Sequence, residues 1–159
     1  MIAPRRELLP VHPGGIPEEL KARPQWVAWR LEERDGDLTK VPYTPLTDRK
    51  ASSTDLLTWG GFEEALAAFR KGQRDGIGFV FSSGDPYCGI DLDGCRKPAS
   101  GELAAWAEEI VDSLDGYAEV SPSGEGVHVI VRGKTPSRRR DAIEIYSSER
   151  FFTMTGQAL

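Results

Sequence analysis

The sequence predicts an α+β fold. A short helix-and-strand unit comes first, followed by strands that pair mostly as antiparallel hairpins, with one long amphipathic helix among them. The 17 glycines and 11 prolines indicate many turns and no dominant long helix. A chain of 159 residues, 39% hydrophobic, can bury a core as one compact domain or a pair of small lobes. We expect a flexible arm at residues 1–16 and a single domain at 17–159, which could be the front module of a longer protein.

The first half combines short helical turns with a hairpin. Pro17 and Pro24 bracket a helical turn, and the aromatic alternation of "QWVAWRLEE" predicts a strand. "RDGD" is a hairpin turn, and Pro42 places the returning strand at a sheet edge. The expected elements are therefore a helical turn at 17–23, strands at 25–33 and 38–45, a polar loop at 48–55, and a helix within 53–72 that carries Phe62, Leu66 and Phe69 on one stripe and stops at Gly72.

The second half is mostly strand. Two buried strands are expected at 76–82 and 87–93, joined by "SGDP". A helix is expected at 100–116, with Ser100 as N-cap and with Leu103, Trp106, Ile110 and Leu114 on its buried side. Hairpins are expected at 117–133 and 141–156.

Composition restricts the function classes. No run of 18 apolar residues is present and the N-terminus lacks an apolar signal segment, so we expect a cytoplasmic protein with no membrane partner. The formal net charge of −5 argues against a generic cationic coat for nucleic acid, although cations cluster at 49–50 and 134–140. Cys88 and Cys95 are too few for a disulfide framework or a four-ligand zinc site, so buried free thiols are favoured over zinc held with His128.

Two aspartates end the strand "YCGIDLDGC". Because side chains alternate along a strand, Asp91 and Asp93 point to one face, and Cys88, Ile90 and Leu92 point to the other. Two neighbouring carboxylates repel unless a cation lies between them, and hard divalent cations prefer carboxylate oxygens. The alternative is an ordinary surface turn at Asp93-Gly94.

The same alternation gives the next strands a polar face. In "GVHVIVRG", His128 lies opposite the valines, and in "AIEIYSS", Glu144 and Tyr146 lie opposite the isoleucines. Each of these residues alone is compatible with an ordinary structural or solvated position. Three strands with one apolar and one polar side indicate a shared functional face.

A serine- and glycine-rich loop, "SPSGEG", precedes His128. Glycine lets backbone N–H groups approach an anion closely, and the hydroxyls of Ser121 and Ser123 add donors. The alternative is a plain hairpin turn. Beside the acids, the loop is a candidate cradle for a triphosphate.

In this order, "GIDLDGC", "SPSGEGVHVIV" and "AIEIY…RFFTMTG" resemble the three motifs of the archaeo-eukaryotic primase superfamily, in particular the primase–polymerase domain of phage and plasmid replication proteins. The likeness spans roughly residues 20–156 and includes "KVPYTPLTDRKASSTDLLTW". It implies an N-terminal α/β unit packed on an RRM-like catalytic sheet. It also implies template-directed nucleotidyl transfer, that is, DNA primase and DNA polymerase activity in phage or plasmid replication.

The resemblance implies roles for individual residues. Asp91, Asp93 and Glu144 would be catalytic and would hold two divalent ions, Mg²⁺ or Mn²⁺. Glu144 departs from the aspartate often found there. Nucleotide binding would fall to Ser123, Gly124 and His128, with Lys40 and Arg150 as further candidates. Arg138, Arg139, Arg140 and Lys50 are candidate DNA contacts, and Arg49 a candidate phosphate contact. The implied partners are template DNA, nucleoside triphosphates and a helicase module or other replication partner.

Two alternatives stay open. A metal-dependent nuclease is favoured by Lys97 just after the acids, whereas a rolling-circle initiator is disfavoured because His12 lies in the expected arm. The other alternative is a nucleic-acid-binding module that has lost turnover.

Overall fold

The structure is a computed structural model, and it describes residues 7–159. Its first half contains η1 (Pro13–Gly15), α1 (Glu18–Lys21), β1 (Trp26–Arg34), β2 (Asp37–Tyr43), η2 (Leu56–Thr58), α2 (Phe62–Ala68), η3 (Phe69–Gln73) and β3 (Gly76–Phe81). Its second half contains β4 (Tyr87–Leu92), α3 (Ala105–Ser113), β5 (Gly116–Val120), β6 (Val127–Arg132), β7 (Arg138–Arg140), β8 (Ile143–Tyr146) and β9 (Arg150–Met154).

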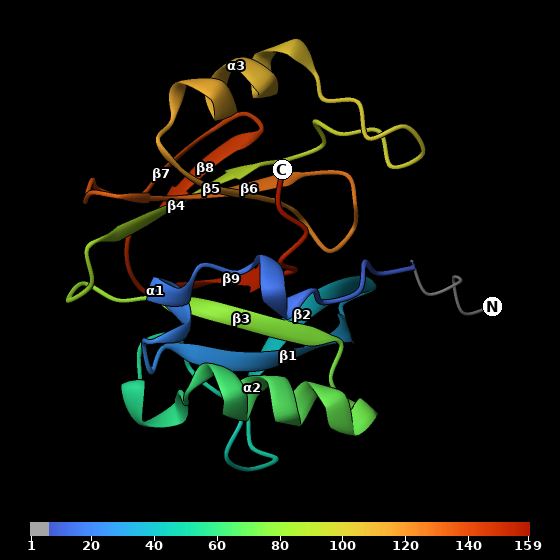
Figure 1. Cartoon of the computed structure of the whole chain (residues 1–159). Helices are drawn as coiled ribbons and strands as arrows, with labels where there is room; N and C mark the ends of the chain where they lie inside the picture. Colours follow the sequence, from blue (N-terminus) through green and yellow to red (C-terminus); the bar gives the residue numbers. More distant parts are fainter. Residues whose placement is uncertain (1–6) are drawn as a thin grey trace.

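The strands form two antiparallel sheets, which confirms the α+β prediction. The first sheet has the order β2-β1-β3-β9 and the second has the order β5-β6-β4-β8-β7. Figure 1 shows α2 beside the first sheet and α3 over the outer face of the second. The other face of the second sheet is turned toward β9, and this is the face that bears the polar residues.

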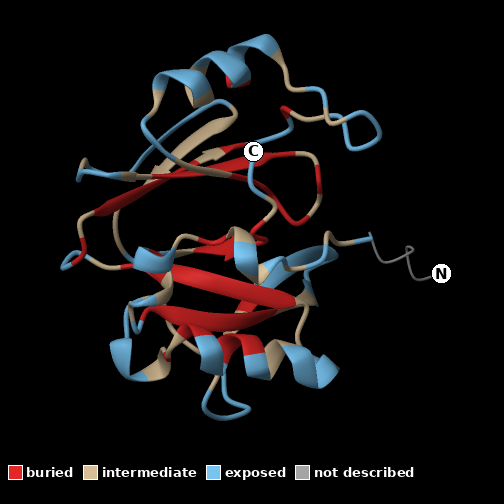
Figure 2. Cartoon of the chain, viewed as in Figure 1, coloured by how far each residue is buried: buried red, intermediate tan, exposed pale blue. Residues whose placement is uncertain are grey.

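An aromatic core joins the two sheets. Phe152 of β9 packs edge-on against Phe81 at 5.0 Å and against Tyr146 of the second sheet at 5.3 Å, measured between ring centroids. Tyr87 and Ile130, also from the second sheet, belong to the same buried cluster. Gly89 makes this approach possible, because a Cβ there would lie 2.5 Å from the Phe152 and Phe81 rings. Figure 2 shows that the strands on both sides of this core are buried.

A second core lies under α3. Ile90, Leu92, Val127 and Val129 form it from the sheet side, and Ala107, Ile110 and Val111 from the helix side. The predicted apolar faces of these strands are therefore confirmed. Cys88 and Cys95 are free and buried, as expected. The predicted helix start was wrong, because α3 begins after Ala104 and not at Ser100, and Trp106 is 38% exposed rather than packed on the sheet.

Two other predicted elements differ. The segment 141–156 is not a hairpin, because β8 pairs with β4 and β7 in the second sheet whereas β9 pairs with β3 in the first. The chain changes sheets at the turn where Glu149 adopts a left-handed φ of 59°. The segment 53–72 contains a separate 3₁₀ turn, η2, before α2, and Gly72, with φ of 88°, ends the helical run as predicted.

The expected arm at 1–16 lies partly outside the described residues. From Leu9 onward the chain is held on the body: the Leu9 N–H donates to the Pro122 carbonyl at 2.8 Å, and the His12 N–H donates to the Thr155 carbonyl at 2.7 Å. Ile16 is buried in the aromatic core. None of the helices within residues 7–159 combines the length and the apolar character that crossing a bilayer requires.

Candidate active site

One residue from each strand of the second sheet forms a row across its inner face. Strand register pairs Glu119 with His128, His128 with Asp91, Asp91 with Glu144, and Glu144 with Arg139. Directly paired residues of antiparallel strands project to the same side of a sheet. We call Glu119, His128, Asp91, Glu144 and Arg139 the polar row.

Asp91 lies at the centre of the polar row and its side chain is 28% exposed. Burial raises the pKa of the Asp91 carboxyl to about 6, and the negative charges of Asp93 and Glu144 add to the increase. Lys40 and Arg139 act in the opposite direction. Asp91 is thus a crowded carboxylate that a further cation would stabilise.

Asp93 is exposed, just beyond the end of β4, where its backbone N–H donates to the Ala142 carbonyl at 2.8 Å. This bond holds the end of β4 beside the start of β8, so that Asp91, Asp93 and Glu144 are neighbours. Asp93 and Glu144 are each close enough to Asp91 for their charges to raise its pKa.

Lys40 reaches these acids from β2 of the other sheet. Burial lowers the pKa of the Lys40 ammonium, and the charges of Asp91 and Asp93 oppose that decrease. The ammonium also lies 5.9 Å from the centre of the Trp29 ring. Lys40 therefore lies next to the carboxylates, and its contact to a nucleotide phosphate stays a prediction.

His128 is buried between Asp91 and β9. Its ring stacks on Phe152 at 4.5 Å between centroids, and its Nδ1 lies 3.0 Å from the Thr153 carbonyl oxygen. Its Nε2 lies 3.5 Å from Asp91 Oδ1. Burial lowers the pKa of His128 to about 3, and the Lys40 charge contributes, so the ring is neutral near pH 7.

The tautomer of His128 follows from these contacts. A carbonyl oxygen can only accept, so Nδ1 carries the proton and donates it to Thr153. The Nε2 lone pair is then directed toward Asp91. A phosphate oxygen could accept a hydrogen bond from Nε2 only if that nitrogen became protonated.

Glu144 and Arg150 flank Tyr146. Burial and a hydrogen bond to Glu144 raise the pKa of Tyr146, and the Arg150 guanidinium lies 5.6 Å from the Tyr146 ring centre. Arg150 and Tyr146 line a hollow of about 380 Å³ together with Pro42, Ala51, Ser52, Ser53, Glu149 and Phe151. Arg150 is thus near the third acid rather than near the Ser/Gly loop.

The backbone N–H donors of the Ser/Gly loop form hydrogen bonds within the loop itself. The N–H groups of Gly124 and Gly126 donate to the Ser121 carbonyl and hydroxyl, at 2.9 and 3.1 Å, and the Glu125 N–H donates to the Ser123 hydroxyl at 3.2 Å. The loop therefore already satisfies the donors of Gly124, Glu125 and Gly126. Its role as a phosphate cradle stays a prediction that requires these bonds to open.

On the exposed edge strand β7, Arg139 lies on the opposite face of the sheet from Arg138 and Arg140. Arg139 pairs with Glu144 in the polar row, whereas Arg138 and Arg140 pair with Ile145 and Ile143, whose side chains face α3. Lys50 forms a bridge with Tyr43, and its charge acts on Glu32 of β1. The Lys50 contacts that we can describe therefore lie on the first sheet and not with the acids.

Carboxylate oxygens from adjacent strands are suitable ligands for Mg²⁺ or Mn²⁺. Within residues 7–159, however, no three His, Cys, Asp or Glu side chains lie close enough to form a complete ligand set. This also applies to the zinc alternative. Asp91, Asp93 and Glu144 match a hard cation in chemistry and in their mutual repulsion, and they would have to move closer to bind it.

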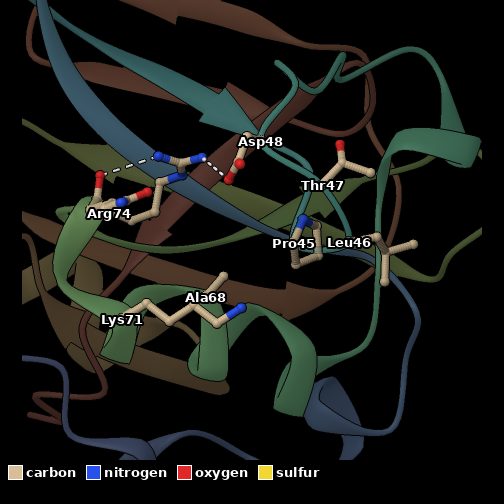
Figure 3. Close-up of a pocket in the computed structure, with 8 residues that line it drawn as sticks. Pro45, Leu46, Thr47, Asp48, Ala68, Lys71 and Arg74 are labelled. Carbon is tan, nitrogen blue, oxygen red and sulfur yellow. Dashed lines mark hydrogen bonds and ion pairs between the residues drawn. The ribbon is translucent and has the colours of Figure 1, made fainter.

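A separate hollow of about 200 Å³ lies between residues 45–48 and the end of the α2–η3 helical run (Figure 3). Its Arg74 forms an ion pair with Asp48 at 3.7 Å and lies 4.1 Å from the Tyr43 ring centre. This hollow shares no residue with the polar row. Its arginine is already engaged, which makes it a poor candidate for the reaction site.

No family model matches the sequence. The DNA primase-polymerase of Nitratiruptor phage NrS-1 is 40% identical over 141 residues. The two chains are related. The aligned region covers 84% of this chain but only 19% of the phage protein, so the chain spans about a fifth of its relative's length. The relationship to a primase-polymerase is in line with the predicted resemblance, and membership of the wider superfamily stays a prediction.

The sequence analysis did not predict two residues of this region. Glu119 is fully buried beside His128, and the alternation of "YAEVS" could have placed it on the polar face. Arg96 donates from Nη1 to the Gly124 carbonyl at 2.9 Å, which fixes the Ser/Gly loop, while its buried Nε has no hydrogen-bond partner among the described residues. No pattern near Arg96 indicates this contact, because it joins loops 28 residues apart.

Proposed function

We propose that this chain catalyses template-directed nucleotidyl transfer, as the catalytic module of a DNA primase–polymerase in phage or plasmid replication. The observation that carries the proposal is the polar row, in which Asp91, Glu144 and a neutral His128 lie in register. Asp93 and Lys40 lie beside them. The related phage protein supports the reaction class by its name.

In this proposal, Asp91, Asp93 and Glu144 hold two divalent ions, which when bound supply charge neutralisation for the triphosphate and lower the pKa of the attacking hydroxyl. Lys40 and Arg139 orient the phosphates from the two ends of the acid cluster. His128 faces the nucleotide with Nε2, since Nδ1 is engaged by Thr153, and would donate to a phosphate oxygen once Nε2 is protonated. Template DNA and nucleoside triphosphates are the substrates, and a helicase module or replication partner would open the duplex.

The nuclease alternative has lost its specific support. The Lys97 ammonium forms an ion pair with Glu102 at 3.1 Å, on the exposed loop after β4, and does not join the acids. A binding module without turnover would have no need for three repelling carboxylates, and keeping them costs stability.

Extension of a labelled primer on a template, with nucleotides and Mn²⁺ or Mg²⁺, tests the proposal. We expect extension by the wild type and a loss of roughly a hundredfold or more in Asp91→Asn and Glu144→Gln, because each removes a charge that would hold the divalent ions. Asp48→Asn is the matched control, an exposed aspartate in the separate hollow, and should keep full activity.

The three hypotheses give different products. Primer shortening would indicate a nuclease, and template binding without any change in length would indicate a module that has lost turnover. Near-normal extension by Asp91→Asn would contradict the assignment of the acids.

A further inference from the structure

Glu119 is a buried carboxylate that the proposed reaction does not use. It is 0% exposed, and it forms no ion pair with any residue that the structure describes. Oε2 accepts from the Thr155 N–H at 2.7 Å, and Oε1 accepts from the Gly156 N–H at 3.1 Å and the Tyr117 hydroxyl at 3.0 Å. The Thr155 hydroxyl also lies 3.1 Å from Oε2, and it shares its one proton with the Val120 carbonyl. Burying an ionisable group costs free energy, so such a group is found in a protein interior where hydrogen bonds satisfy it.

These bonds fix the chain directly after β9. Gly156 is in a left-handed conformation with φ of 70°, and a Cβ there would lie 1.9 Å from the His12 carbonyl oxygen, so no other residue fits without rearrangement. Thr155 and Gly156 are therefore held on both sides, by Glu119 and by the segment at His12. Thr153, two residues earlier, is the residue whose carbonyl accepts the Nδ1 proton of His128.

We propose that Glu119 is a positioning residue, which sets the Thr153 carbonyl through Thr155 and Gly156 and thereby fixes the tautomer and orientation of His128. With Nδ1–H held by Thr153, the Nε2 lone pair of the neutral ring faces the reaction side of the sheet, 3.5 Å from Asp91 Oδ1. If the Thr153 carbonyl moved, the ring could adopt the other tautomer or turn about Cβ. The effect on the ring is independent of the proposed function, whereas the effect on nucleotide binding rests on it.

Glu119→Gln tests this with little change in size. The amide can accept at one end only, so its NH₂ group faces N–H donors at the other end and at least one bond to the Thr155–Gly156 segment is lost. Imidazole ¹⁵N spectra report the result directly. The chain has two histidines, and His12→Gln identifies the His128 signals. We expect protonated Nδ1 and unprotonated Nε2 in the wild type, and a mixture of tautomers in Glu119→Gln.

Nucleotide affinity is the second readout. Loss of a buried hydrogen bond that orients the contacting ring should weaken nucleotide binding by roughly tenfold, measured by calorimetry. If the wild type binds no nucleotide, the proposed function fails, and the imidazole spectra still decide the role of Glu119.

Asp85→Asn is the control for a change at another buried carboxylate. Asp85 accepts from the Ser82 and Tyr87 N–H groups, at 2.7 and 2.8 Å, in the turn between β3 and β4, and unlike Glu119 it forms an ion pair, with Lys134 at 3.0 Å. Its loss should lower stability and leave the His128 tautomer unchanged. If Glu119→Gln lowers stability in the same way, with unchanged His128 signals and nucleotide affinity, Glu119 only stabilises the fold and the proposal is overturned.

A milder variant covers the case in which Glu119→Gln does not fold. Thr155→Val removes the hydroxyl, with its bonds to Glu119, the Val120 carbonyl and the Gln157 N–H, and keeps the backbone N–H bond to Glu119. It should move the His128 signals in the same direction by a smaller amount, and unchanged signals would overturn the proposal.

Discussion

Asp91 is the residue at which stability and the proposed chemistry conflict. Its carboxyl is mostly buried, it neighbours two other carboxylates, and its pKa is raised to about 6. The folded protein therefore binds a proton at Asp91 more tightly than the unfolded chain does. The wild type is expected to lose stability from this group as pH rises from about 4 to about 6, and to lose no more above that range.

Asp91→Asn should raise stability where Asp91 is ionised. In EDTA at pH 7.5 we expect the variant to be more stable than the wild type by about 1 to 3 kcal/mol, and the difference should disappear near pH 4. Urea unfolding at both pH values measures this. Mn²⁺ should then stabilise the wild type more than the variant. A variant that is less stable at pH 7.5 would mean that Lys40 and Arg139 already neutralise the carboxylate.

At the scale of elements, β7 presents its arginines to two different surroundings. Arg139 joins the polar row, and its charge lowers the pKa of Asp91, whereas Arg140 lies on the face shared with Ile143. Since β7 is a sheet edge, all three arginines are exposed. Alternation in a strand of three residues thus places one basic cluster on two faces of the sheet.

Arg139→Ala should therefore lower nucleotide transfer by roughly tenfold to a hundredfold, as expected when one fixed cation near the reacting phosphate is lost. Arg140→Ala should instead weaken primer–template binding with little change in the KM for nucleotide. Steady-state extension with each substrate varied in turn separates the two. Equal effects of both variants on DNA binding alone would show that β7 is a uniform basic patch.

Sequence patterns predicted the sheet face on which a residue lies better than they predicted which strands pair. Alternation correctly separated Asp91 and His128 from Ile90 and Val127, because a period of two determines the side to which each residue points. It could not reveal that β8 and β9 belong to different sheets, since strand pairing depends on contacts between distant segments. Glu119 was missed for a related reason, because its partners Thr155 and Gly156 lie 36 and 37 residues away.

At the scale of the whole molecule, the site lies between two sheets of a chain with net charge −5. The acids and His128 come from one sheet, whereas Lys40 and Thr153 come from the other. Because the net charge is negative, the proposed function implies weak long-range attraction to DNA, and the proposed DNA contacts would rest on local cations such as those of β7.

Single-strand binding should accordingly depend only modestly on salt. Each neutralised phosphate adds about −0.7 to the slope of log K against log salt, so three or four local contacts give a slope of about −2 to −3. Fluorescence anisotropy over a range of salt concentrations measures it, and Mn²⁺ with a matching nucleotide should tighten binding because the acids are then neutralised. A steep slope, or tight binding that ignores metal and nucleotide, would identify a module that mainly binds DNA.

The pairing of β9 with β3 also determines when the site is formed. Met154 pairs with Ile77, so the strand that carries Thr153 docks only after a long loop has closed. During synthesis, a chain that has already folded through Glu144 has its acids in register but lacks the carbonyl that orients His128. Such a nascent chain would hold carboxylates without an ordered histidine, so the competence of the site would depend on the last residues to join the fold.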